Sequence, residues 1–293
     1  WKSNYLNELS IKETDNIDLV IFGAWNEMYK FWAKTIKAKA KYIWWTSSIG
    51  QVELSQVEHI FIQQIVEACN ASIFDGVIYS GLGSEFLFKE VKNLYYLPYP
   101  IHSYDYAPAE KEWAVGMFLP NHPRKNILNQ LAGISNANTI LRSKNYSKML
   151  KIYTNLNIAG QNTESTGWLS RNDYLSLISK IKVNMHVTLT ETLSYGVVDS
   201  ILTGVIPIIS PCIEDNFSFP LKTVEKTILV QNTDSPYLIG NRIAKIAEMD
   251  RTEYNYLLNV LRERVFYLAK TNNKIVKDTL DSIIMRTLDY NQN

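Results

Sequence analysis

The sequence predicts an α/β protein with two domains, each built on a parallel β-sheet. Short β-branched runs alternate with segments that carry apolar residues at helical spacing, a pattern typical of strands joined by crossover helices. The chain has 293 residues, enough for two domains of ordinary size. A stretch with three prolines and little apolar periodicity, residues 98–111, separates the two sets of elements and is typical of a hinge.

Composition excludes several classes of protein. The chain is 46% hydrophobic and 20% charged, which is typical of a globular protein. Its net charge of +1 gives no overall positive field that would attract nucleic acid, so we expect no nucleic-acid partner. The sequence has no apolar run of about 18 residues that would predict a membrane span, and we expect a cytoplasmic protein. Cys69 and Cys212 are the only cysteines, which favours a reducing compartment, although a single bridge between them stays open. The chain opens at Trp1 without a starting Met, so we expect a fragment or a trimmed chain.

Residues 1–100 are expected to form a first, Rossmann-like domain. The expected strands are residues 18–23, 42–46, 76–80 and 94–97, and the expected helices are residues 27–41, 54–71 and 85–91. This alternation implies a parallel sheet. His59 lies on the second of these helices, where a surface or core role is favoured over a role as a proton shuttle.

One face of the first predicted helix is basic. Four lysines fall on it: Lys30, Lys34, Lys37 and Lys41. The ordinary interpretation is a solvated surface helix. The alternative is a basic face that meets anionic lipid or another polyanion, so peripheral membrane contact stays open.

Residues 101–272 are expected to form the second domain. Its expected strands are residues 113–119, 140–141, 150–153, 156–160, 186–189, 205–209 and 226–230. Its expected helices are residues 127–134, 178–181, 197–202, 235–249 and 253–269, with polar loops at 161–166 and 211–217. A last helix, residues 275–288, lies in a C-terminal segment that spans residues 273–293.

Residues 187–210 are the most informative part of the chain. They predict a strand, a loop, a helix that ends at Gly204, and a second buried strand. A loop that runs from the carboxyl end of a strand into a helix directs backbone N–H groups and the positive end of the helix dipole above the sheet. Such a position is an anion site, most often for phosphate.

Two acids flank this loop. Glu191 precedes it and Asp199 lies about one turn into the helix, so both can face the same crevice. Carboxylates repel phosphate but accept hydrogen bonds from sugar hydroxyls. The loop and the two acids together therefore suit a nucleotide sugar. The other interpretation is an ordinary α/β loop with two solvated acids.

The segment resembles a known family motif. The order of Glu191, seven residues, Asp199, and then Gly204 and Pro207 before an apolar strand resembles the E-x7-E segment of retaining glycosyltransferases of the GT-B type, especially family four. Asp199 replaces the usual second Glu, and the usual Phe-Gly after the first acid is absent, with Tyr195-Gly196 coming a few places later.

The resemblance implies the GT-B fold, in which two Rossmann-like domains face each other across a cleft. Residues 74–80 and 97–101 resemble two pieces of the family's N-terminal, acceptor-side domain, whose earlier strand–helix repeats are missing or much reduced in this chain. The resemblance therefore implies a shortened N-terminal domain and a donor-binding second domain. It also implies that the last helix, within residues 273–293, returns toward the first domain.

The resemblance further implies roles for individual residues. Asp199 corresponds to the acid that binds the ribose, and Glu191 to the acid that contacts the transferred sugar. Lys125 corresponds to the family's diphosphate-binding lysine, and Arg124 stands in for the family's arginine, because Met117 occupies the position of that arginine. The remaining implied donor-binding positions are Gly116, Trp168 and Leu169, together with the backbone amides of Ser194, Tyr195, Gly196 and Val197, which would bind the phosphates.

Trp168 and Leu169 would lie beside the nucleotide base, although for Trp168 a buried position is favoured over a stacking platform. Asn172 would cap the helix that follows. The chain has no Asp-x-Asp sequence, so we expect protein cations rather than Mg²⁺ to neutralise the diphosphate, and we expect no metal and no cofactor.

The function implied is a metal-independent, retaining transfer of a sugar from a UDP- or GDP-linked donor. The acceptor, whether a glycan, a lipid-linked molecule or a protein, stays open. One alternative is a catalytically inactive subunit that binds a nucleotide sugar or a partner, given the missing first repeats and the altered arginine site. Another alternative is a sugar-nucleotide epimerase on the same architecture.

Overall fold

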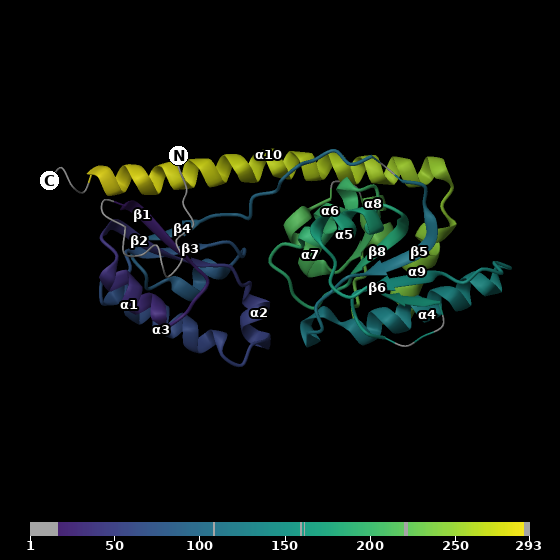
Figure 1. The fold of residues 1–293 in the computed structure, drawn as a ribbon, viewed down its shortest axis with the longest axis horizontal. Helices are drawn as coiled ribbons and strands as arrows, with labels where there is room; N and C mark the ends of the chain where they lie inside the picture. Colours follow the sequence, from purple (N-terminus) through teal and green to yellow (C-terminus); the bar gives the residue numbers. More distant parts are fainter. Residues whose placement is uncertain (1–16, 108, 159, 161, 220–221, 290–293) are drawn as a thin grey trace. The chain divides into compact units, whose positions relative to one another are not determined.

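The computed structural model describes residues 17–107, 109–158, 160, 162–219 and 222–289 (Figure 1). These residues form two compact units. Unit 1 contains residues up to Pro100 together with those from Asn272 onward, and unit 2 contains residues from Ile101 to Thr271. Each unit is built on a sheet whose described strands are all parallel, so the predicted α/β class is confirmed.

Unit 1 has a four-stranded sheet in the order β1-β2-β3-β4. The strands are β1 Ile17–Gly23, β2 Ala38–Trp45, β3 Gly76–Tyr79 and β4 Leu94–Tyr96. The connections carry α1 Met28–Thr35, α2 Ile49–Leu54, α3 Glu58–Asn70 and the 3-10 helix η2 Ser84–Phe88. Helices α1 and α3 lie on one face of this sheet (Figure 1).

The other face of this sheet is covered by a helix from the C-terminal part of the chain. The last part of helix α10, Arg251–Asp289, belongs to unit 1. Its Ile283 is fully buried and packs in one core with Tyr42 and Ile78. Both faces of the sheet are therefore buried, as is usual for parallel sheets, and the strands are accordingly rich in apolar residues.

The basic helical face predicted in unit 1 is wrong. Helix α1 ends at Thr35 and β2 begins at Ala38, so Lys37 and Lys41 do not continue the face of Lys30 and Lys34. The alternation of lysines with Ala38 and the buried Ala40 has the period of a strand, and burial against α10 overrides the helix propensity of alanine. The expected helix over residues 54–71 is likewise two helices, because extended backbone at Ser55 ends α2 before α3 begins.

Unit 2 has a five-stranded sheet in the order β7-β6-β5-β8-β9. Its strands are β5 Glu112–Met117, β6 Lys151–Thr154, β7 Thr163–Ser165, β8 Ile181–His186 and β9 Ile206–Ile209. Its helices are η3 Pro123–Lys125, α4 Ile127–Ser143, α5 Arg171–Ile178, α6 Tyr195–Leu202, α7 Pro211–Phe217, α8 Lys222–Ile228, α9 Pro236–Glu248 and the first part of α10. The sheet grows outward in both directions from β5 and β8, so the order of strands reverses between these two.

Alternate residues of the central strands enter two different cores. Val115 and Met117 of β5 pack in a core that includes Ile134 of α4 and Ile239 of α9. Ala114 packs on the opposite side with residues that include Ile178 of α5. The sheet of unit 2 is therefore covered on both faces, which leaves the ends of its strands open for ligand binding.

Several elements of unit 2 differ from the sequence prediction. The expected strand at 140–141 is the end of α4, and β7 forms in the expected loop at 161–166 rather than at 156–160. Strand β8 ends at His186, where the expected strand begins. The helix end at Gly204, which has a φ of 86°, is confirmed.

Three helices also replace other expectations. Residues 211–217 form α7 rather than a loop, because Pro211 is favourable in the first turn of a helix. Residues 222–228 form α8, and only a single bridge from Leu229 to Ile209 remains of the expected strand at 226–230. The two expected helices 253–269 and 275–288 are one helix, α10, which contains neither Gly nor Pro. Within the described residues, no helix is both long and apolar enough to span a bilayer.

Candidate functional site

The predicted site residues meet where the strand order of unit 2 reverses. Arg124 and Lys125 follow the carboxyl end of β5, and Glu191 follows the carboxyl end of β8. In open parallel sheets, ligands bind outside the carboxyl ends of the strands at such a reversal, because the two connections leave on opposite faces and open a crevice.

The loop after β5 is held by local hydrogen bonds. The His122 Nδ1 accepts the Arg124 backbone N–H at 3.2 Å, which starts the short helix η3. Asn126 then takes a left-handed conformation with a φ of 54° and starts α4, while its side-chain amide donates to the Thr233 carbonyl at 2.8 Å. These contacts place the Arg124 and Lys125 side chains at the end of the strand.

Gln130 ties the two site loops together. Its Nε2 donates to the Lys125 carbonyl at 2.6 Å, and its Oε1 accepts the Val187 N–H at 3.1 Å. A further backbone bond runs from the Leu189 N–H to the Arg124 carbonyl at 2.8 Å. Gln130 is fully buried, so it fixes the separation of the cationic loop and the acidic loop.

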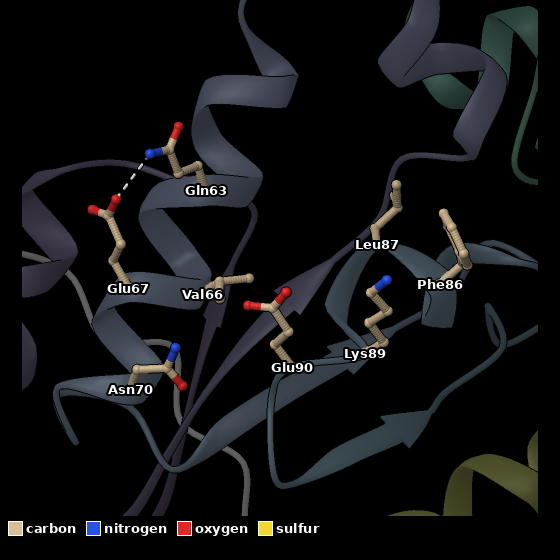
Figure 2. Close-up of a pocket in the computed structure, with 8 residues that line it drawn as sticks. All are labelled: Gln63, Val66, Glu67, Asn70, Phe86, Leu87, Lys89 and Glu90. Atoms are coloured by element: carbon tan, nitrogen blue, oxygen red, sulfur yellow. Dashed lines mark hydrogen bonds between the residues drawn. The ribbon is translucent and has the colours of Figure 1, made fainter.

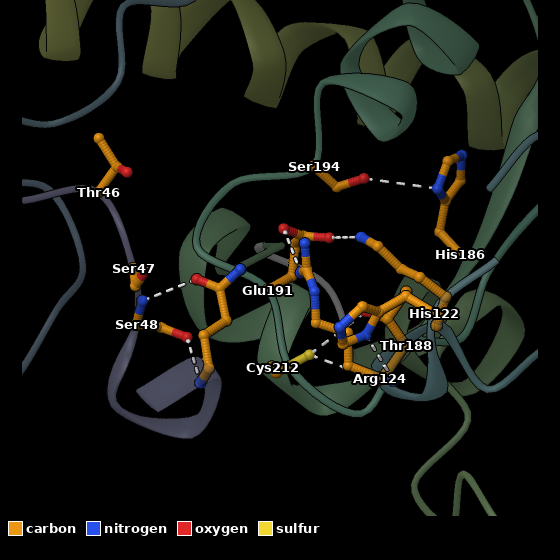
Figure 3. A network of polar contacts seen from close by, with 12 residues as sticks. Thr46, Ser47, Ser48, His122, Arg124, His186, Thr188, Glu191, Ser194 and Cys212 are labelled. Atoms are coloured by element: carbon orange, nitrogen blue, oxygen red, sulfur yellow. Dashed lines mark hydrogen bonds and ion pairs between the residues drawn. The ribbon is translucent and has the colours of Figure 1, made fainter. Parts of the chain in front are cut away.

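The centre of the site is an ion-paired cluster. Lys125 donates through Nζ to the Glu191 Oε2. The Arg124 Nη1 lies 3.4 Å from the Glu191 Oε1, and Figure 3 shows these two side chains facing each other. The side chains of Lys125 and Glu191 are 8% and 12% exposed, and that of Arg124 is 24% exposed. The cluster therefore keeps one net positive charge in a largely desolvated place, which suits an anionic ligand.

Asp199 is placed in a second ion pair. Its carboxylate is 4% exposed and accepts hydrogen bonds from the Nη1 and Nη2 of Arg171, with the Nη2 at 2.6 Å from Oδ1. The Tyr104 hydroxyl also donates to Oδ1 at 2.9 Å. Burial and the Asp199 carboxylate raise the pKa of Tyr104, so its phenol remains a donor. Arg171 is 56% exposed, so a ligand that needs Asp199 could displace it into solvent.

The first turn of α6 begins at Ser194. The Val197 and Val198 N–H groups donate back to the Ser194 carbonyl at 3.0 and 3.3 Å. Of the four predicted phosphate-binding amides, that of Val197 is therefore already engaged within the helix. The Ser194 hydroxyl lies 3.4 Å from the His186 Nδ1 (Figure 3).

His186 supports this turn from below. A side chain at Gly196 would bring Cβ within 2.4 Å of the His186 Cε1, so glycine lets the helix lie directly on the imidazole. Burial first, and then the charge of Lys125, lower the pKa of His186 to about 3, while a hydrogen bond to the Gly196 backbone acts in the opposite direction. The ring is therefore neutral at ordinary pH, and its Nε2 lies 3.2 Å from the Asn184 side-chain amide.

Other predicted residues have varied positions. Gly116 is buried in β5, where an added Cβ would lie 2.4 Å from the Ile181 Cδ1, so its small size serves packing. Trp168 is 79% exposed, so the favoured buried position is wrong, and Leu169 beside it is half-buried. Asn172 does not cap α5, because the Ser170 hydroxyl accepts the Asp173 N–H instead.

Some features of the chain lie outside this cluster. His59 is exposed on α3 in unit 1, as the surface interpretation expects, and both Cys69 and Cys212 are free thiols. Across the ranges that the structure describes, no group of three or more His, Cys, Asp or Glu side chains could hold a metal ion.

Sequence reasoning missed Gln130, Arg171 and His186 as parts of the site. Gln130 falls on the buried stripe of α4 together with Ile134 and Leu141. A polar side chain on an apolar stripe is a signal that could have indicated a fixed hydrogen-bonding role. The partner of Arg171 lies on another helix, and the contacts of His186 lie in its own strand and at the start of α6. Neither arrangement leaves a comparable pattern in the sequence.

No protein-family model matches the chain, and no curated protein sequence is significantly similar to it. Solved structures do share its fold. A UDP-forming α,α-trehalose-phosphate synthase from Burkholderia xenovorans, in complex with glucose-6-phosphate, is 10% identical with a TM-score of 0.66, over 94% of this chain and 74% of that one. A trehalose-6-phosphate synthase, solved to study glycosyl transfer with retention through bisubstrate glycomimetics, is 6% identical with a TM-score of 0.66, over 93% and 76%.

A third similar structure is a TarM variant from S. aureus in complex with fondaparinux, α-GlcNAc-glycerol and UDP. It is 12% identical with a TM-score of 0.63, over 84% of this chain and 51% of that one. At such low identities the likeness concerns the fold. The predicted fold class, α/β with parallel sheets of the GT-B kind, is confirmed by these matches.

Proposed function

We propose that the protein is a glycosyltransferase that uses a nucleotide-diphosphate sugar and retains the anomeric configuration. The observation that carries the proposal is the Arg124–Lys125–Glu191 cluster at the strand reversal of unit 2. The similar structures add support, because they include UDP-forming synthases and a protein solved with UDP.

The cluster suits the charge that develops during transfer. When the bond between the sugar's anomeric carbon and the phosphate oxygen breaks, the electron pair leaves with the diphosphate. Lys125, Arg124 and the amino end of α6 would stabilise that charge from fixed positions, so no reorganisation is needed at the moment of reaction. The acceptor hydroxyl would attack from the same face and pass its proton to the leaving oxygen.

The acids would hold hydroxyl groups. Glu191 is oriented by its two cations, so its remaining lone pairs have fixed directions toward the transferred sugar. Asp199 would bind the ribose after Arg171 moves away. Protein cations rather than Mg²⁺ would neutralise the diphosphate in this scheme, with UDP as the first donor to test.

One observation favours a second candidate function. The Asp199 carboxylate already accepts hydrogen bonds from Arg171 and Tyr104, which leaves little capacity for the ribose. A subunit that binds a nucleotide sugar weakly, without turnover, is consistent with this arrangement.

The test is a screen of UDP and GDP by thermal shift, followed by assays of transfer and hydrolysis with labelled UDP-sugars. Lys125→Ala should lower kcat/KM roughly 10- to 100-fold, because a charge-assisted hydrogen bond to the leaving diphosphate is lost. Lys144→Ala, which removes an exposed lysine paired with Glu248, is the matched control and should leave kcat/KM unchanged.

The outcomes separate the candidates. Turnover that falls with Lys125→Ala but not with Lys144→Ala supports the transferase. A donor complex without turnover favours the binding subunit. Unchanged transfer in the Lys125 variant would refute the assigned role of the cluster.

A further inference from the structure

We propose that unit 2 binds a small phosphate-bearing anion at a second site, a lysine-lined cavity at the amino ends of its strands. The cavity has a volume of about 450 Å³. Four lysines line it: Lys111, Lys148, Lys151 and Lys182. This volume is in the range of small-molecule sites and is large enough for inorganic phosphate or a sugar phosphate.

The cavity lies at the amino ends of the strands, at the opposite end of the sheet from the candidate donor site. Lys111 directly precedes β5, and Lys151 and Lys182 lie in the first two residues of β6 and β8. Asn162, which also lines the cavity, directly precedes β7. All strands of this sheet are parallel, so the lining residues lie together at the end of the sheet where the strands begin. Lys125 and Glu191, by contrast, follow the carboxyl ends of strands.

The lining has an excess of positive charge. Glu112 is its one carboxylate among the described lining residues, and its Oε2 already accepts the Tyr153 hydroxyl at 2.8 Å. Lys151 also pairs with Glu164 at 2.7 Å, which offsets one of the four cations. The charge that remains is best balanced by a multivalent anion in the cavity.

Two of the ammonium groups are held in place by neutral groups. The Lys111 Nζ donates to the Ser179 carbonyl at 2.6 Å, and the Lys182 Nζ donates to the Ala247 and Met249 carbonyls at 2.7 and 3.3 Å. These carbonyls orient the ammonium groups without neutralising them, and an ammonium has three N–H donors. The two lysines are therefore preorganised for a further acceptor, which lowers the entropy lost on binding.

The environment of Lys111 agrees with an anion site. Burial first, and then the charge of Arg262, lower the pKa of Lys111 to about 7. A bound anion would reverse this shift, so binding near neutral pH should be accompanied by proton uptake. Trp113 forms a wall of the cavity beneath Lys182, whose Nζ is 5.4 Å from the ring centroid, and gives an apolar surface for the organic part of a phosphate ester.

A hollow in unit 1 shows the contrast. It has a volume of about 360 Å³ and lies between α3 and η2 (Figure 2). Its charged lining residues are Glu67, Glu90 and Lys89, so acids outnumber cations and an anion would be repelled. The excess of lysine is therefore not a general property of hollows in this chain.

The test uses calorimetric titration of the full chain with inorganic phosphate at constant ionic strength. Lys148→Met and Lys151→Met should each weaken binding about tenfold, because each removes one charge-assisted contact. Lys180→Met is the matched control, since Lys180 is exposed near the cavity but does not line it. Glucose 6-phosphate is the second ligand: tighter binding than phosphate identifies an organic ester, and equal binding identifies the free anion.

A second measurement does not depend on any variant. Phosphate should slow the acetylation of Lys111 by acetic anhydride at pH 7.5, as quantified by mass spectrometry. Binding that is lost with Lys125→Ala and kept in Lys148→Met and Lys151→Met would place the anion at the donor site and overturn the proposal. Unprotected Lys111, or equal affinity in the cavity variants and Lys180→Met, would overturn it as well.

Discussion

Gln130 provides the sharpest test of how the site is held together. We predict that Gln130→Met, which keeps the length of the side chain but removes both polar atoms, destabilises unit 2 strongly. The change leaves the Lys125 carbonyl and the Val187 N–H without their buried partner. Each unsatisfied buried group costs about 1–3 kcal/mol, so the free energy of unfolding should fall by roughly 2–6 kcal/mol.

The measurement is urea unfolding followed by tryptophan fluorescence and far-ultraviolet circular dichroism. The midpoint should fall while the slope m stays unchanged, because the surface exposed on unfolding is the same. Gln63→Met is the matched control: Gln63 is an exposed glutamine on α3 whose amide donates to Glu67 at 3.0 Å. Its free energy of unfolding should change by less than about 0.5 kcal/mol.

A Gln130→Met protein within about 0.5 kcal/mol of the original would refute the reasoning. That result would mean that the two loops are fixed by the Leu189–Arg124 backbone bond and by packing, and that Gln130 contributes little.

Two further predictions concern unit 2. Gly196→Ala should lower the free energy of unfolding by about 1–3 kcal/mol, because the added Cβ would lie 2.4 Å from the buried ring of His186. Thermal unfolding measures this change, with Gly160→Ala as the less crowded control. Equal losses in the two variants would contradict the prediction. Burial raises the pKa of Glu214 to about 7, so the folded state holds a proton that the unfolded state has lost, and stability should fall as pH rises from about 4.5 to 7. Glu214→Gln should flatten this decline in pH-dependent urea titrations, and an unchanged pH profile would contradict the assignment.

The sequence predicts the class of the fold well because the parallel strands are strongly patterned. Runs such as those of β1 and β9 are apolar and β-branched, and the turn at Gly204 is marked by a residue that tolerates a positive φ. Local signals of this kind do not depend on distant partners, so they are legible in the sequence.

The wrong predictions of secondary structure occur where tertiary contacts determine the conformation of a segment. The segment around Ala38 and Ala40 has helix-forming residues, yet it is a strand because its buried face meets α10 from the far end of the chain. The polar residues near Asn272 look like a break between two helices, but without Gly or Pro they continue α10.

The candidate site divides in the same way. The pairing of Glu191 with Lys125 follows from two strand ends at a reversal, although the strand order itself is not readable from the sequence. The ion pair between Arg171 and Asp199 needs a contact between α5 and α6, and no residue spacing in the sequence indicates that contact. Trp168 is 79% exposed in the loop before α5, a position that its large apolar side chain does not indicate.

The division of α10 between the two units has a consequence for biosynthesis. Unit 1 completes its second core with Ile283, which the ribosome adds long after Pro100. At ordinary translation rates this interval lasts roughly ten to thirty seconds, during which Tyr42 and Ile78 present an uncovered sheet face. The nascent first unit is therefore expected to depend on chaperones until the last part of α10 has been synthesised.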